Sequence, residues 1–162
     1  NEIKFLFNLI NMYFKKEITN VVKNGIKIKI IGKINRLPRK IKNVLKETEK
    51  KTFQNNKLTV NLAINYGAKA EIADALTKII KKKNKVKISD SLISKNLYTS
   101  NIIDPDILIR TGGQKRLSNF MLWQLAYSEL YFINKLWPDF NEKDLLNIIK
   151  NFKKTKRNFG SI

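Results

Sequence analysis

Hydrophobic residues near the start of the chain recur at the spacing of an α-helix. The apolar side chains that fall on one stripe are Ile3, Leu6, Ile10, Phe14 and Ile18. This period predicts a helix over residues 2–22, ended by the pair Asn24 and Gly25. Further apolar residues widen the stripe, so we expect the helix to be largely buried, with partners on more than one side.

Farther along the chain, short apolar runs alternate with helical patterns. Strands are predicted over residues 26–32, 58–67 and 107–109, and the first two runs end in glycine. Helical patterns cover residues 39–52, 70–83 and 119–129, and a last helix that Asn141 and Asp144 would cap. This alternation predicts an α/β fold with a mostly parallel sheet flanked by helices. Because no linker or repeat interrupts it, residues 1–162 are interpreted as one domain.

Composition narrows the classes of function. The 162 residues include neither cysteine nor histidine, which excludes disulfides, Cys- or His-based metal sites and histidine general bases. The formal net charge of +20 suggests a polyanionic partner such as nucleic acid. However, the 33 basic residues are scattered along the chain, which favours a solvated basic surface. Nucleic-acid binding therefore remains a weaker alternative.

Two arginines, two glycines and a serine follow the third predicted strand, in the stretch ILIRTGGQKRLSNF. Arg110 comes just past the strand, where parallel sheets bind ligands. Gly112 and Gly113 would let backbone N–H groups approach an anion, and Arg116 adds a bidentate donor. Ser118 would cap the following helix and face the same point. The pattern fits a phosphate or diphosphate site, although a tight turn with two exposed arginines is the alternative.

Glu129 is an isolated acid at the end of the predicted 119–129 helix. It is either an ordinary solvent-facing acid or a Mg²⁺ ligand, because Mg²⁺ prefers carboxylate oxygens. A straight helix would separate it from Ser118 by roughly 16 Å at 1.5 Å per residue. Either the chain folds back early, or Glu129 serves the anion site from another subunit.

Several segments together resemble one enzyme family. They are DPDILIRTGGQKRLSNFMLWQLAYSELYF, LWPDF, the closing KRNFG, and the earlier KIKIIG and LTVNLAINYG. In these motifs and their order the chain is similar to the cis-prenyltransferases, closely the bacterial undecaprenyl diphosphate synthases, or isoprenyl transferases. The resemblance implies a non-Rossmann α/β fold, a homodimer and an elongated hydrophobic tunnel. It also implies condensation of isopentenyl diphosphate with an allylic diphosphate to a cis-polyprenyl diphosphate, the undecaprenyl-type lipid-carrier precursor for cell-wall synthesis.

The resemblance assigns roles to individual residues. The positions that match isopentenyl diphosphate binding are Arg110, Arg116, Ser118 and the backbone at Leu117. Glu129 matches a Mg²⁺-associated glutamate, so Mg²⁺ is the implied cofactor, and Leu58 matches a bulky tunnel-floor residue. The first helix would form a tunnel wall, with Phe5, Leu9 and Tyr13 as its candidate side chains.

The chain also departs from the family pattern. Gln114 replaces a usual glutamate, and Lys115 stands where some members carry histidine. The family's Asp-Gly-Asn-Gly-Arg-Trp loop, its histidine motif and its Ser-x-x-Asn-Trp-x-Arg-Pro segment do not occur, so the sequence looks cut at its N-terminus. No catalytic residue is therefore assigned to this chain, and we expect it to be inactive alone. A non-catalytic remnant or an accessory subunit is the alternative to an enzyme. We expect a cytoplasmic protein that binds no nucleic acid, with peripheral membrane contact left open.

Overall fold

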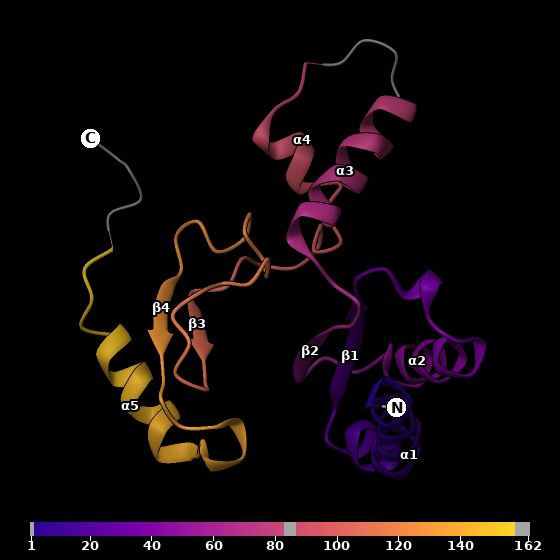
Figure 1. Ribbon diagram of the computed structural model, residues 1–162, viewed down its shortest axis with the longest axis horizontal. Helices are drawn as coiled ribbons and strands as arrows, with labels where there is room; N and C mark the ends of the chain where they lie inside the picture. The colour runs from indigo at the N-terminus through magenta and orange to yellow at the C-terminus, as the bar shows by residue number, and fades with distance from the viewer. Residues whose placement is uncertain (1, 83–86, 158–162) are drawn as a thin grey trace.

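The computed structural model describes residues 2–82 and 87–157 (Figure 1). The strands are β1 (Ile26–Ile31), β2 (Leu58–Ala63), β3 (Ile107–Arg110) and β4 (Glu129–Phe132). The α-helices are α1 (Glu2–Lys23), α2 (Arg39–Thr52), α3 (Ala68–Lys82), α4 (Asp90–Ser94) and α5 (Glu142–Phe152). Two short 3₁₀ helices, η1 (Ile34–Arg36) and η2 (Trp137–Asp139), precede α2 and α5. Among the helices of these described ranges, none combines the length and apolar character that crossing a membrane requires.

The first sheet pairs β1 with β2 in parallel, from Ile26 opposite Leu58 to Ile31 opposite Ala63. A parallel pair needs a crossover, which α2 provides. The buried core of this half consists of Leu37, Ile41 and Leu45, with partly buried side chains of α1 and β1 packed against it. The predicted helix–strand order is therefore confirmed here.

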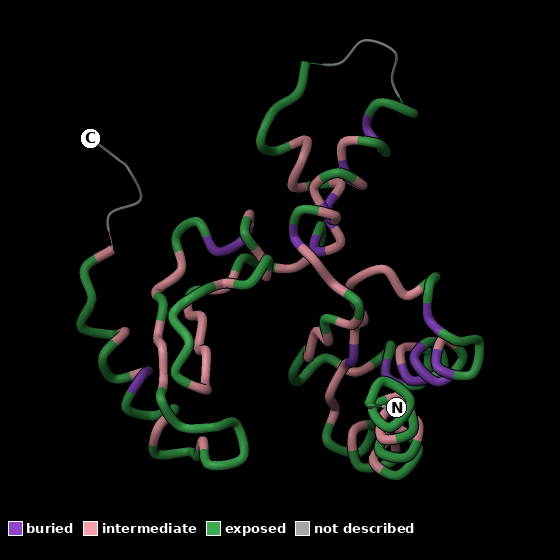
Figure 2. Tube along the Cα trace, in the orientation of Figure 1, coloured by how far each residue is buried: buried purple, intermediate pink, exposed green. Residues whose placement is uncertain are grey.

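Helix α1 forms where the sequence predicts a helix, but it is less buried than predicted. It ends one residue before Asn24, and Gly25 follows with a φ of +70°, as the sequence pattern predicts. None of its residues is buried (Figure 2). Phe5 remains 62% exposed. The prediction of a largely buried helix is wrong because α1 packs mainly against α2, along one side.

The second sheet pairs β3 with β4, again in parallel, from Ile107 opposite Glu129 to Arg110 opposite Phe132. In Figure 1 the strands follow one another across the view as β4, β3, β2 and β1, with α5 beyond β4 and α1 and α2 beside β1. Helices α3 and α4 extend away from both sheets. The α/β fold with parallel strands is confirmed, although the described strands form two separate pairs.

The segment from residue 117 to residue 128 contradicts the sequence interpretation. A helix over 119–129 is predicted, but the chain there forms consecutive turns and then enters β4 at Glu129. Three non-glycine residues in this segment have left-handed backbones, with φ values of 49° at Ser118, 62° at Asn119 and 46° at Met121. A right-handed helix cannot contain such residues. The turns let the chain return to pair with β3.

Candidate functional site

A cavity of about 250 Å³ lies at the end of β3. Its lining residues are Leu108, Ile109, Arg110, Arg116, Leu117, Ser118 and Phe120. All four residues that the sequence assigns to anion binding, Arg110, Arg116, Leu117 and Ser118, therefore line one cavity. We call this cavity the anion pocket. Its position at the carboxyl end of a parallel strand is where such sheets bind ligands.

Arg110 organises the anion pocket. It is the last residue of β3, and its Nη1 donates to the Ser118 hydroxyl at 3.1 Å and to the carbonyl of Arg116. These bonds hold the loop after β3 against the strand end. The guanidinium has five donors, so some remain available for an anion alongside these two bonds.

Arg116 is held by a neutral neighbour. Its Nη1 donates to the side-chain oxygen of Gln114 at 2.5 Å, and the residue is exposed. An amide oxygen orients the guanidinium without cancelling its charge. Two arginine side chains therefore face one small cavity, which makes the pocket suited to a phosphate or diphosphate.

Gly112 and Gly113 do not supply free N–H groups to this pocket. Both adopt positive φ values, 86° and 74°, as a tight turn after a strand requires. Their N–H groups donate to the carbonyls of Lys135 at 2.8 Å and Ile133 at 2.9 Å. The prediction that these amides approach the anion is wrong, because they tie the turn to the segment after β4.

Ser118 lines the anion pocket for a different reason than predicted. It does not cap a helix, since turns directly follow it, and its backbone is left-handed. Its hydroxyl nevertheless faces Arg110. The side chain thus has the predicted position without the predicted secondary structure.

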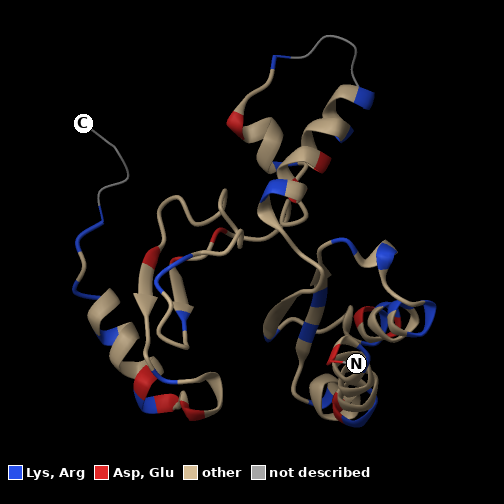
Figure 3. Cartoon of the chain, viewed as in Figure 1, with Lys and Arg blue, Asp and Glu red and all other residues tan. Residues whose placement is uncertain are grey.

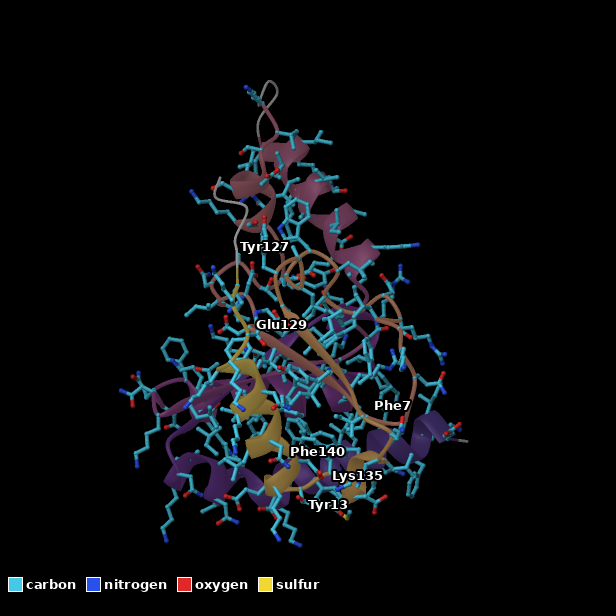
Figure 4. The ribbon with its side chains drawn as sticks, turned by 90° about the vertical axis from the view of Figure 1, so that its left-hand side faces the viewer. Phe7, Tyr13, Tyr127, Glu129, Lys135 and Phe140 are labelled. Atoms are coloured by element: carbon cyan, nitrogen blue, oxygen red, sulfur yellow. The ribbon has the colours of Figure 1, made fainter. Side chains whose placement is uncertain are left out.

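Glu129 lies apart from the anion pocket. It is the first residue of β4 and is paired with Ile107, whereas Arg110 is three residues farther along β3. This separates the two by about 10 Å along the strands. Figure 4 shows Glu129 at the opposite end of β4 from Lys135, the residue whose carbonyl binds the Gly112 turn. Early folding back of the chain is confirmed, but it does not bring Glu129 to the anion.

The carboxylates of a single chain do not fit a Mg²⁺ site at the anion pocket. Glu129 is too distant, and the described residues contain no group of three or more His, Cys, Asp or Glu side chains that could hold a metal.

A second, apolar cavity of about 190 Å³ lies between α1 and the first sheet. Its lining residues are Tyr13, Phe14, Glu17, Ile18, Val21, Ile28, Thr48 and Leu62. Of the predicted tunnel-wall residues, Tyr13 lines it. Leu58, at the start of β2, is 55% exposed and is absent from this lining, so its tunnel-floor role stays a prediction.

A buried carboxylate in α3 lies outside the lining of the anion pocket. Glu71 of α3 is fully buried, and it accepts hydrogen bonds from the Tyr66 hydroxyl at 2.5 Å, the Tyr98 N–H at 2.7 Å and the Gln124 amide at 3.0 Å. Burial, with the hydrogen bond to Glu71, raises the pKa of Tyr66. Gln124 also donates to Thr99 at 2.8 Å. Glu71 thereby joins α3 to the turns that lead away from the pocket.

The sequence interpretation missed Phe120 and Glu71. Phe120 lines the anion pocket, and its ring lies 5.6 Å from that of Tyr66 in an edge-to-face contact. Both residues lie in segments with a helical pattern, and the helix predicted around Phe120 does not form. An acid on the apolar face of the 70–83 pattern is the one sequence signal that could have indicated Glu71.

Comparison with known proteins identifies the family. The family model described as putative undecaprenyl diphosphate synthase matches residues 1–160. The chain belongs to this prenyltransferase family. It is 50% identical to an isoprenyl transferase of Rickettsia bellii over 159 residues, covering 98% of this chain and 70% of that protein. It is 44% identical to an isoprenyl transferase of Prochlorococcus marinus, covering all of this chain and 61% of that protein.

Solved prenyltransferase structures share the fold. Lavandulyl diphosphate synthase from Lavandula x intermedia, in complex with dimethylallyl diphosphate, matches with a TM-score of 0.92 and 32% identity over 99% of this chain and 72% of that one. A probable undecaprenyl diphosphate synthase from Campylobacter jejuni matches with a TM-score of 0.90 and 36% identity, over 99% and 75%. The accessory-subunit and nucleic-acid alternatives find no support in these relatives. Lys and Arg are also spread from one end of the described chain to the other (Figure 3).

Proposed function

We propose that this prenyltransferase-family protein condenses isopentenyl diphosphate with an allylic diphosphate to give a cis-polyprenyl diphosphate. The observation that carries the proposal is the anion pocket, a cavity of about 250 Å³ at the end of β3. Arg110, Arg116 and Ser118 line it, and Arg110 donates to the Ser118 hydroxyl. The pocket holds the diphosphate of isopentenyl diphosphate. The apolar lining from Leu108 and Phe120 suits the short hydrocarbon attached to it.

The reaction needs no protein nucleophile. The carbon–oxygen bond of the allylic diphosphate breaks, and the diphosphate leaves with the bonding electrons. The double bond of isopentenyl diphosphate attacks the allylic carbon, a carbon–carbon bond forms, and a proton is lost to leave a new double bond. The residues of the anion pocket fix the attacking double bond in position, and such positioning is a large part of catalysis between two substrates.

Direct binding tests the proposal independently of turnover. Isothermal titration of isopentenyl diphosphate into the 162-residue chain should give a dissociation constant that rises at least tenfold in Arg116→Ala. Each charge-assisted bond contributes about 1.5–3 kcal/mol, and about 1.4 kcal/mol corresponds to a tenfold change. Arg39→Ala is the matched control, because Arg39 is an exposed arginine at the start of α2, outside the anion pocket. Equal affinities for wild type, Arg116→Ala and Arg39→Ala would refute the assignment.

Glu129 belongs to a second part of the proposal. We infer that it serves a Mg²⁺-dependent site in a homodimer, where a second chain contributes to the same site. Its distance from the anion pocket within one chain supports this, because a metal-associated acid there must act elsewhere or on another subunit. Glu129→Gln should weaken the Mg²⁺ dependence of substrate binding and leave Mg²⁺-free isopentenyl diphosphate binding unchanged. If Mg²⁺ dependence is identical in both proteins, Glu129 is an ordinary acid. The homodimer and the cytoplasmic location stay predictions from the family resemblance.

A further inference from the structure

The loop that carries Ser118 has a backbone that its sequence alone does not favour. Ser118, Asn119 and Met121 are all left-handed, a region that side chains other than glycine rarely occupy. Asparagine accepts it more readily than serine or methionine. Three such residues within four positions persist only when the surrounding structure holds them. A contact from outside the loop must therefore hold this conformation.

Asn119 supplies that contact at the start of α3. Its backbone carbonyl accepts the Ala68 N–H at 2.8 Å, and its side-chain oxygen accepts the Lys69 N–H at 2.9 Å. These are the first two N–H groups of the helix, which have no partner inside it. A capping residue normally comes just before the helix. Here it is about fifty residues away in the sequence.

Gly67 makes room for this remote cap. It precedes α3 and has no side chain with which to cap the helix itself. A Cβ placed on Gly67 would lie 2.9 Å from the side-chain nitrogen of Asn119. The helix start is therefore shaped to receive Asn119.

The residues on either side of Asn119 face the anion pocket. Ser118 accepts a hydrogen bond from Arg110, and Phe120 lines the same pocket. Asn119 itself is absent from the lining and binds α3. One residue thus anchors the loop while its two neighbours contribute to the pocket.

We propose that Asn119 is a positioning residue, which caps α3 and thereby holds the Ser118 hydroxyl and the Phe120 ring in place around the anion. This inference rests on the proposed function of the anion pocket. Displacement of a binding group by about 1 Å can lower a rate or affinity up to a hundredfold. Loss of the Asn119 contacts is therefore expected to weaken isopentenyl diphosphate binding, although Asn119 does not touch the ligand.

Three substitutions separate the cap from the backbone conformation. Asn119→Asp keeps an oxygen that can accept the Lys69 N–H, and an acid is favourable at a helix start. Asn119→Gly keeps the left-handed backbone but removes the side-chain cap. Asn119→Ala removes the cap and disfavours the left-handed backbone. We expect dissociation constants for isopentenyl diphosphate close to wild type in Asn119→Asp, raised several-fold in Asn119→Gly, and raised about tenfold or more in Asn119→Ala.

Asn141→Ala is the control for a purely structural cap. Asn141 caps α5 by accepting from the N–H groups of Lys143 and Asp144, and it lies outside the anion pocket. Its removal should lower the melting temperature as Asn119→Ala does, but leave the dissociation constant unchanged. If Asn119→Ala does not fold, Asn119→Gly carries the same comparison.

The outcomes distinguish the two proposals. Wild-type affinity in both Asn119→Ala and Asn119→Gly, with weakened binding in Arg116→Ala, overturns the positioning role and leaves the proposed function intact. Equal weakening in Asn141→Ala and Asn119→Ala also overturns it, because the effect would then follow stability. If wild type itself does not bind isopentenyl diphosphate, the proposed function and this inference both fail.

Discussion

Replacing Glu71 should destabilise the protein far more than its single position suggests. The carboxylate is fully buried and accepts three hydrogen bonds, from Tyr66, Tyr98 and Gln124. A hydrogen bond to a charged group contributes about 1.5–3 kcal/mol, and a buried donor without a partner costs about 1–3 kcal/mol. Gln124 is 2% exposed, so the amide hydrogen that it donates to Glu71 would lose its acceptor without gaining water, while the bond to Thr99 remains. The other two donors are only partly buried and can regain water.

The Glu71→Ala variant should therefore lose about 3–5 kcal/mol of unfolding free energy, because it removes three hydrogen bonds to the carboxylate and leaves one buried Gln124 hydrogen without an acceptor. Glu71→Gln should lose less, because one amide oxygen still accepts while the amide nitrogen faces the other donors. Urea unfolding followed by circular dichroism measures both losses. The slope of the unfolding free energy against urea concentration should be the same in wild type and variants. Glu47→Ala is the matched control, since Glu47 is an exposed glutamate paired with Lys51 in α2 and should change stability little.

A loss in Glu71→Ala no larger than that in Glu47→Ala would refute this reasoning. It would mean that water reaches all three donors, or that the turns around Tyr98 and Gln124 repack at little cost. The relation between Glu71→Ala and Glu71→Gln is equally informative. Equal losses would show that neither the side-chain volume nor the one remaining amide oxygen contributes, and that the three donors need the full carboxylate.

The remaining predictions concern backbone and pH. Gly32→Ala should prevent folding or cost several kcal/mol, because the new Cβ would lie 2.2 Å from the Ile64 carbonyl oxygen. Gly25→Ala should cost about 1–3 kcal/mol in urea unfolding, the strain of a left-handed residue, since it meets only a flexible lysine side chain. The hydrogen bond from Lys135 lowers the pKa of Asp144 in the folded protein. The contribution of Asp144 to stability is therefore present above the unfolded-state pKa of about 4, and it is lost as the pH falls through the folded-state pKa. Melting temperatures of wild type and Asp144→Asn should therefore differ at pH 7 and converge towards pH 3, and a constant gap would contradict this.

Local signals were enough to predict most elements. Strands β1 and β2 lie within their predicted runs, β3 extends one residue beyond its run to include Arg110, and the cap of α5 is the expected Asn141. Asp144 completes the predicted capping box of α5. These features depend on neighbours within a few residues, which a sequence displays directly.

The segment after the anion pocket could not be predicted in this way. Its apolar residues recur at helical spacing, but Asn119 binds α3, Gln124 binds Glu71, and residues from Glu129 onward pair with β3. Each of these partners is distant in the sequence. Tertiary contacts therefore override the local preference, and β4 has only four residues with which to signal a strand.

The anion site shows the same division between chemistry and backbone. The chemistry of Arg110, Arg116 and Ser118 predicts an anion site, and these residues do line one pocket. The roles of the Gly112 and Gly113 N–H groups and of a helix start depend on backbone geometry, and both predictions are wrong. Residue types indicate what a site can bind, whereas backbone donors depend on which carbonyls the fold brings near them.

The bond between Gln114 and Arg116 has a consequence for how a ligand would enter. A glutamate at residue 114 would form an ion pair with Arg116, and an incoming diphosphate would have to displace that carboxylate. The Gln114 amide holds the guanidinium at 2.5 Å without an opposing charge. Capture of the anion should then be fast and strongly dependent on ionic strength, because the long-range attraction of a free positive charge is screened by salt. In this chain no carboxylate at residue 114 competes with the ligand for Arg116, so the charge of Arg116 can attract an incoming anion from a distance.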